Sequence, residues 1–173
     1  SMKRSSKKQA PAAVPAEKCL FTLEVTIVQG LMTEQFWEQN PVVSRTIRIR
    51  GDQTLEDLHY AIFDAFKRFD EHMYEFTLGK KPYDPKAKRY VLPGALEDVL
   101  DQSDAPEEDL TLTTIGSLGL KVRQTFGYLF DFGDDWWHEI KVVGIEEQIP
   151  RGKYPKVVKR VGKSPPQYPD WDE

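Results

Sequence analysis

The chain contains 173 residues, of which 39% are hydrophobic and 30% are charged, and its formal net charge at pH 7 is −4. A chain of this length is typical of one globular domain with its own core, and its apolar runs are too short for a membrane-spanning helix. The single cysteine, Cys19, excludes an internal disulfide, and no apolar leader is present, so we expect a cytoplasmic protein without a membrane partner.

The charge is divided unevenly along the chain. Residues 1–18 carry five lysines and arginines against Glu17 alone, a net charge of +4. Because the whole chain has a net charge of −4, the remaining residues carry −8. The first segment has no apolar periodicity, and we expect residues 1–18 to form a disordered basic tail. The acidic remainder is unlike a general nucleic-acid-binding protein, although a basic tail can contact nucleic acid.

Two strands are predicted first. Residues 20–28 and 42–50 are rich in β-branched and apolar side chains at alternating positions, as in strands with a buried face. In the second strand, Arg45 interrupts the apolar face that Ile47 continues. Residues 30–41 are expected to form a connection or a short helix that covers the sheet.

A helix is predicted from Thr54, because Asp57 three residues later is typical of a capping box. Apolar residues then recur at helical spacing, which predicts a buried stripe. The stripe comprises Leu55, Leu58, Ile62, Phe66 and Phe69. His59 lies at its edge, where we expect a histidine that has satisfied hydrogen bonds or reaches the surface. Residues 72–78 alternate again, so the front half has the strand–strand–helix–strand order of a β-grasp.

Residues 79–93 are predicted to form a loop in which basic residues are interleaved with Tyr83 and Tyr90. Cations and aromatic rings together can contact phosphates and stack on bases, although an ordinary exposed loop has the same composition. The candidate nucleic-acid contacts are Lys80, Lys81, Lys86, Lys88 and Arg89.

Residues 126–142 are the densest run of aromatic and acidic residues and predict a β-hairpin. Aromatic and apolar side chains alternate on both sides of the turn residues 133–135. A three-residue loop pairs Phe132 with Trp136 and places Phe126, Tyr128, Phe130 and Phe132 on the same face as Trp136, His138, Ile140 and Val142. A two-residue loop would mix apolar and charged residues, so we predict the odd-length loop.

The hairpin tip supplies candidate catalytic residues. They are Asp131, Asp134, Asp135, His138 and Glu139. Carboxylates beside a histidine can ligate a metal or act as general acid and base, as in a metal-assisted hydrolase or nuclease. The alternative is that the aspartates only build the turn and His138 packs on an aromatic face. A shared site requires His72 to approach His138 in space.

The segment Tyr128-Leu-Phe-Asp-Phe-Gly-Asp-Asp-Trp-Trp-His-Glu-Ile140 resembles the signature of the plasmid pRiA ORF-three-like family. Residues 54–62 and 72–76 also resemble that family, and the similarity covers residues 20 to 155. The resemblance implies an α+β domain of uncharacterised function that occurs near mobile elements in varied bacterial contexts.

Two features depart from what the resemblance implies. Members often carry cysteines in a proline-rich segment after a Tyr-Pro dipeptide, but here Val157 follows Tyr154-Pro155-Lys156, and Ser164 precedes the next prolines. The missing thiols count against a thiolate zinc site. Some members have been labelled transposon resolvases, yet no nucleophilic serine among arginines and no DNA-binding appendage is evident in this sequence.

Together these patterns predict an α+β fold with a mixed, mostly antiparallel sheet and one main helix. We expect a single domain over residues 19–150 and an extended proline-rich tail over residues 151–173. The absence of glycine-rich phosphate loops, nucleophile elbows and paired cysteines favours a binding or adaptor domain with a protein partner over an enzyme. We expect no cofactor and no bound metal, and the sequence specifies no oligomeric state. The candidate binding residues are His59, His72, Tyr128, Trp136 and Trp137.

Overall fold

The structure is a computed structural model that describes residues 13–79, 81, 83–96 and 106–171. Its centre is an eight-stranded sheet with the strand order β5-β4-β3-β6-β7-β1-β2-β8. Neighbouring strands are antiparallel except β4 and β5, which are parallel. The fold is therefore α+β with a mixed, mostly antiparallel sheet, as the sequence predicted.

The elements of the described chain follow one another in this order: the 3₁₀ turn η1 (Ala16–Lys18), β1 (Leu20–Gln29), α1 (Glu34–Gln39), β2 (Ser44–Arg50), α2 (Leu55–Ala65), β3 (Tyr74–Thr77), β4 (Arg89–Val91), α3 (Pro93–Leu96), β5 (Glu107–Asp109), the 3₁₀ turn η2 (Ile115–Leu118), β6 (Thr125–Phe130), β7 (Trp136–Glu146) and β8 (Lys156–Val161). The order β1, β2, α2, β3 agrees with the predicted front half, with α1 inserted between the first two strands. None of the helices described is long and apolar enough to cross a bilayer.

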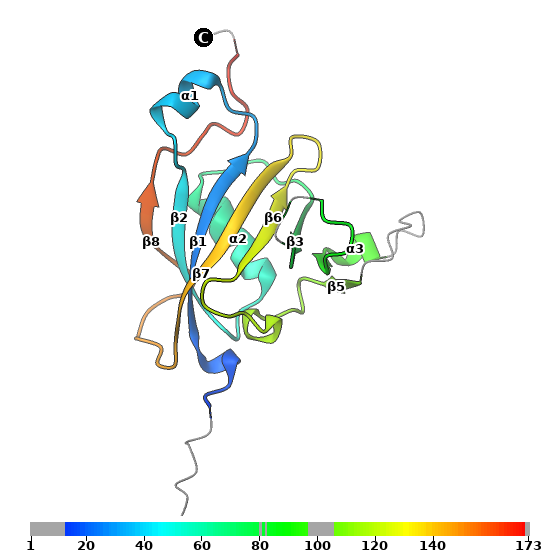
Figure 1. The fold of residues 1–173 in the computed structure, drawn as a ribbon, viewed down its shortest axis with the longest axis vertical. Coiled ribbons are helices and arrows are strands. Elements are labelled where there is room, and N and C mark those ends of the chain that lie inside the picture. Colours follow the sequence, from blue (N-terminus) through cyan, green and yellow to red (C-terminus); the bar gives the residue numbers. More distant parts are fainter. Residues whose placement is uncertain (1–12, 80, 82, 97–105, 172–173) are drawn as a thin grey trace, which may run out of the picture.

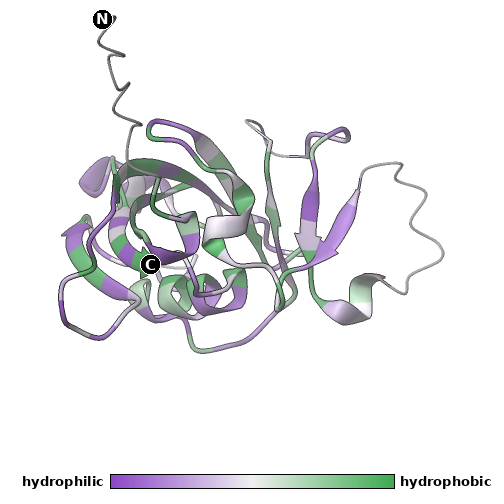
Figure 2. Cartoon of the chain, turned by 90° about the horizontal axis from the view of Figure 1, so that it is seen from below, coloured by the Kyte–Doolittle hydropathy of each residue, from purple (hydrophilic) through white to green (hydrophobic). Residues whose placement is uncertain are grey.

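The main helix, α2, lies behind the sheet in Figure 1 and packs against one of its faces. Strand residues alternate between hydrophobic and hydrophilic in Figure 2, as expected when one face of a sheet is buried. The core formed in this way includes Phe21, Leu23, Val25, Ile47, Leu58, Ile62, Tyr128, Phe130, Trp136 and Ile140. The opposite face of β1, β2 and β7 carries no helix in Figure 1.

The predicted capping box of α2 is present. The Thr54 hydroxyl accepts a hydrogen bond from the Asp57 N–H at 3.1 Å, and the Asp57 carboxylate accepts one from the Thr54 N–H at 2.9 Å. The predicted stripe is buried as far as Phe66, but Phe69 is 72% exposed. The helix ends at Ala65 and Lys67 has φ of 54°, so Phe69 leaves the helical stripe.

The hairpin has the predicted faces but a different register. Phe130 pairs with Trp136, where Phe132 was expected, and the loop contains residues 131–135. Five residues and three residues are both odd numbers, so the side chains of β6 and β7 keep their predicted faces, but Phe132, expected on the core face, lies in the loop and is 46% exposed. The loop starts early because Asp131 has φ of 64° and its carboxylate accepts hydrogen bonds from the N–H groups of Gly133 and Asp134.

Both terminal segments make contacts with the fold. Of the predicted basic tail, residues 16–18 form η1, and residues 1–12 lie outside the described part of the chain. The segment 151–173 was expected to be only an extended tail, but part of it forms β8, which pairs with β2. Residues 162–170, which we call the C-terminal strap, then return across the molecule towards α1 (Figure 1).

Candidate binding surface around His72

The five residues predicted at the hairpin tip do not form one cluster. Asp131 and Asp135 both have positive φ and are joined by a hydrogen bond from the Asp135 N–H to the Asp131 carbonyl at 2.7 Å, so both build the loop. Glu139 is exposed on the uncovered face of β7, whereas His138 points into the core. The structure therefore separates the histidine from the carboxylates.

His138 is buried, and its Nδ1 lies 3.2 Å from the Tyr128 carbonyl oxygen. Its ring packs against those of Phe66 and Tyr128. Burial, followed by the nearby positive charge of Arg68, lowers the pKa of His138 to about 3. The side chain is therefore a neutral core residue at physiological pH.

His59 is also buried, and it connects the core to the surface. Its Nδ1 lies 2.6 Å from the Tyr128 hydroxyl and its Nε2 lies 3.2 Å from a Glu71 carboxylate oxygen. Burial lowers the pKa of His59 to about 3 and raises that of Tyr128. A neutral His59 with its proton on Nε2 satisfies both contacts, because it accepts from Tyr128 and donates to Glu71. The ring also stacks on Tyr74, with the centroids 3.5 Å apart.

His72, by contrast, lies at the surface, where three segments meet. Its Nε2 is 2.7 Å from the Tyr168 hydroxyl of the C-terminal strap and 3.5 Å from a carboxylate oxygen of each of Asp70 and Asp131. The Tyr168 hydroxyl donates to Asp70 at 2.6 Å. His72 thus contacts Asp131 and the strap, whereas His138 packs against rings in the core.

An open depression of about 570 Å³ lies beside His72. It is lined by Glu56, Tyr60, Glu71, His72, Met73, Tyr74 and Leu92. Apolar side chains stand exposed around it, and the rings of Phe69 and Tyr168 meet edge to face at 5.9 Å. We use the name His72 surface for the residues Tyr60, Phe69, Asp70, Glu71, His72, Met73, Asp131, Asp134 and Tyr168.

The His72 surface is acidic. Of its four carboxylates, Asp70, Glu71 and Asp131 contact histidines, and none of the four forms an ion pair with a lysine or arginine of the described residues. Burial, followed by the charge of Asp64, raises the pKa of Glu71. Burial, followed by Asp131, raises the pKa of Asp134. In both cases the charge of a neighbouring carboxylate adds to the effect of burial, as expected near negative charge that no cation of the described chain neutralises.

The two predicted binding tryptophans are packed rather than exposed. Trp136 lies under the guanidinium of Arg68, whose carbon is 4.1 Å from the ring centroid, and Arg68 donates to the Pro165 carbonyl at 2.8 Å. Burial lowers the pKa of Arg68 to about 10, so it remains charged. Within the described chain, Nε and Nη2 of Arg68 and Nε1 of Trp136 have no hydrogen-bond partner. Trp137, 4% exposed, lies on Gly127 and near Tyr83 on the opposite face.

The predicted basic loop is partly neutralised. Lys88 forms an ion pair with Glu108 at 2.7 Å, and Arg89 pairs with Glu107 at 2.6 Å. Lys81 and Lys86 are exposed, and Lys80 lies outside the described residues.

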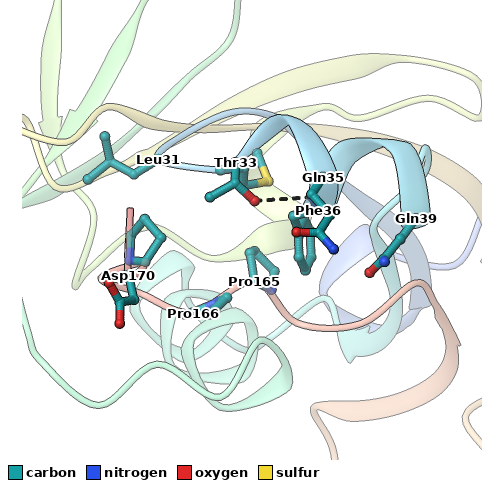
Figure 3. A pocket seen from close by; sticks show the side chains of 10 residues that line it. Leu31, Thr33, Gln35, Phe36, Gln39, Pro165, Pro166 and Asp170 are labelled. Atoms are coloured by element: carbon teal, nitrogen blue, oxygen red, sulfur yellow. Dashed lines mark hydrogen bonds between the residues drawn. The ribbon is translucent and has the colours of Figure 1, made fainter. Parts of the chain in front are cut away.

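A second depression, of about 260 Å³, lies between α1 and the C-terminal strap (Figure 3). Leu31, Thr33 and Phe36 approach it from the α1 side, and Pro165, Pro166 and Asp170 from the strap. The Thr33 hydroxyl accepts from the Phe36 N–H and caps α1. The lining combines apolar and polar side chains and includes a single carboxylate. Within the described ranges, no three His, Cys, Asp or Glu side chains are arranged to hold a metal ion.

Sequence reasoning identified His72 and Asp131 but missed Asp70, Glu71 and Tyr168. Tyr168 is separated from Asp70 and His72 by 98 and 96 residues. The only local signal is an aromatic residue between prolines in the C-terminal segment, and this pattern does not identify the residues that Tyr168 contacts.

Comparison with known proteins agrees with the fold. The family described as plasmid pRiA4b ORF-3-like protein matches residues 35–168. The uncharacterized protein y4hQ of Sinorhizobium fredii is 26% identical over 129 residues, which are 73% of this chain but only 59% of the length of that relative. The crystal structure of the protein of unknown function MM3350 from Methanosarcina mazei Go1 is similar with a TM-score of 0.61 and 20% identity, over 82% of this chain and 68% of that one. The matched residues include α2, the β6–β7 hairpin and β8, and the chain therefore belongs to the plasmid pRiA4b ORF-3-like family.

Proposed function

We propose that this protein is a binding domain that captures a cationic segment of a protein partner at the His72 surface. The observation that carries the proposal is the combination of four carboxylates lacking a lysine or arginine partner in the described residues with exposed aromatic rings around an open depression. Charge complementarity steers and orients partners, and aromatic side chains supply much of the affinity at interface centres.

The chemistry of the surface favours arginine or lysine in the partner. Carboxylates such as Asp70 and Glu71 accept charge-assisted hydrogen bonds from a guanidinium, and the rings of Tyr60 and Phe69 offer faces for a cation. Tyr60 and Glu71 line the same depression. An extended cationic side chain can therefore place its stem on apolar surface and its charge beside a carboxylate.

The arrangement also supports binding over catalysis. The two histidines with strongly lowered pKa values, His59 and His138, are closed off in the core. The hydroxyl of Tyr128, which contacts His59, is buried and has a raised pKa, the opposite of an activated nucleophile. The surface groups that a ligand can reach are charged and aromatic.

The test uses synthetic peptides and the full chain. A peptide with two arginines flanking a phenylalanine is titrated against the protein by calorimetry, with the same peptide carrying glutamates as its control. We expect binding of the arginine peptide only. In the variant Asp70→Asn/Glu71→Gln its affinity should fall about tenfold, which is about 1.4 kcal/mol.

The matched control removes two carboxylates elsewhere, in Glu38→Gln/Glu147→Gln, and should leave the affinity nearly unchanged. Phe69→Ala should weaken binding, whereas Leu112→Ala, which removes an equally exposed apolar side chain, should not. Equal binding of both peptides, or equal losses in the two charge variants, would contradict the proposal.

A further inference from the structure

A second charged surface lies along β8, which is an edge strand of the sheet. Residues 148–169 contain no aspartate or glutamate but six basic residues. These are Arg151, Lys153, Lys156, Lys159, Arg160 and Lys163, and all six are exposed. None of them forms an ion pair with a carboxylate of the described residues; the ion pairs nearest to β8 are Arg48–Glu146 and Arg50–Asp52 on β2 and its turn. We call these six residues the basic strip.

The register of β8 places like charges opposite each other. Arg160 lies across from Arg45, and Lys156 lies across from Arg48. Like charges in directly opposed positions destabilise a sheet. Arg45 is committed to the fold, because it is buried and donates to the carbonyls of Ala65 and Val161, so the repulsion persists in the native state.

A β-bulge places the two lysines of β8 on the same face of the sheet. Val157 pairs with Ile47 and Lys159 pairs with Thr46, so Val158 is the extra residue. In a regular strand, residues three apart face opposite sides of a sheet. Because of the bulge, Lys156 and Lys159 both lie on the side of Thr46 and Arg48, which is the face without a helix in Figure 1, whereas Arg160 lies on the side of Arg45.

Protection of an exposed edge explains only part of this arrangement. Lysines on an edge strand prevent edge-to-edge association, and the bulge contributes to this. That role needs a charge of either sign at a few positions. It does not require six cations without an intervening anion, nor cations across from the arginines of β2. Such a concentration of unpaired positive charge in a protein with a net charge of −4 indicates a polyanionic partner.

We propose that the basic strip binds the phosphate backbone of nucleic acid without reading its sequence. Nucleic acid is favoured over an acidic peptide because the bulge at Val158 interrupts the hydrogen-bond ladder that an added strand would need. No free aromatic ring accompanies the strip, since Tyr154, between Lys153 and Lys156, is half-buried and donates to the Pro150 carbonyl, and the Tyr168 hydroxyl contacts Asp70 and His72. Contacts limited to phosphates give affinity that depends on salt and not on base sequence.

The experiment measures fluorescence anisotropy of labelled duplexes of about 20 base pairs, in two unrelated sequences, with the full chain between about 50 and about 200 mM salt. We expect similar affinities for the two sequences and a steep loss with salt. The variant Lys156→Gln/Lys159→Gln/Arg160→Gln should lose about tenfold or more in affinity, and its salt slope should decrease by up to about 3, near 0.9 for each phosphate contact removed.

The matched control is Lys67→Gln/Lys121→Gln/Arg123→Gln, which removes the same charge from other exposed positions and should bind within about twofold of the wild type. A charge-conserving variant, Lys156→Arg/Lys159→Arg/Arg160→Lys, should retain binding and shows whether β8 tolerates substitution. Equal losses in both glutamine variants would assign binding to overall charge or to the basic tail and would overturn the proposal. Strip-dependent binding to polyglutamate or to phosphatidylserine vesicles, without binding to the duplexes, would overturn it as well.

Discussion

The two buried histidines determine how the protein should respond to acid. In the folded chain His59 and His138 have pKa values of about 3, against an ordinary value of 6.5. Both side chains are neutral in the core, and protonating either would place a charge where burial disfavours it. The unfolded chain has no such restriction and binds both protons readily.

The free energy of unfolding should therefore decrease as the pH falls. Between about pH 6.5 and about pH 3 the unfolded state binds more protons than the folded state, at up to about 1.4 kcal/mol per pH unit for each histidine. Glu71 and Asp134, whose pKa values are raised, oppose this slope. Urea unfolding between about pH 7 and about pH 5 measures the effect, and His59→Gln should remove about half of it. An unchanged slope in that variant would show that His59 titrates normally in the folded state.

At the scale of elements, the pairing of β6 with β7 depends on one glycine. Trp137 of β7 lies flat over Gly127 of β6, so a Cβ at position 127 would stand 2.2 Å from the indole Cη2. No side chain larger than hydrogen fits there unless Trp137 moves. The glycine is thus required by close approach and not by its backbone angles.

Gly127→Ala should destabilise the protein by about 1–3 kcal/mol, because overpacking forces the ring out of its position. Gly94→Ala in α3 is the matched control, since an added Cβ there meets nothing within 4 Å. The control should be neutral or slightly stabilising. Thermal and urea unfolding compare the two variants. Replacing Trp137 by Leu in the Gly127→Ala background should restore part of the stability, and no recovery would contradict the steric explanation.

At the scale of the whole molecule, the C-terminal strap connects elements that are distant in sequence. The Gln167 side chain is 3% exposed, accepts from the N–H groups of Phe69 and Asp70, and donates to the Asp70 carbonyl. Arg45 donates to the Ser164 hydroxyl, and Arg68 to the Pro165 carbonyl. The strap therefore makes hydrogen bonds to residues 68–70, which follow α2 and include part of the His72 surface.

Gln167→Ala should lower the free energy of unfolding by about 1–3 kcal/mol, because it removes three partly buried hydrogen bonds to backbone groups of Phe69 and Asp70. Hydrogen exchange should accelerate at residues 66–70 before it does in the central strands. Pro166→Ala, at an exposed position of the same strap, should have little effect. If both variants behave alike, the strap does not stabilise this part of the fold.

The two proposed surfaces also belong to this scale. The acidic His72 surface lies where α2, β3 and the hairpin loop meet, and the basic strip follows β8 at the far edge of the sheet. The formal charge of −4 conceals this separation, because opposite charges are counted together although they lie on different parts of the molecule.

The sequence by itself determined the features that depend on neighbours a few residues away. The capping box of Thr54, the inward face of each hairpin strand and the place of Arg45 on the apolar side of its strand all follow from short-range spacing, since helices and strands impose fixed periodicities. The odd length of the hairpin loop followed from the same argument, but its position did not.

Only the tertiary structure decided which distant groups meet. The hairpin register moved by two residues as Asp131 turned the chain early and donated its N–H to the Met73 carbonyl. Asp70, His72 and Tyr168 came together through a strap more than 90 residues further along the chain, while His138 was drawn into the core away from Asp131. Such contacts depend on how the whole sheet and helix pack together. No local pattern in the sequence predicts them.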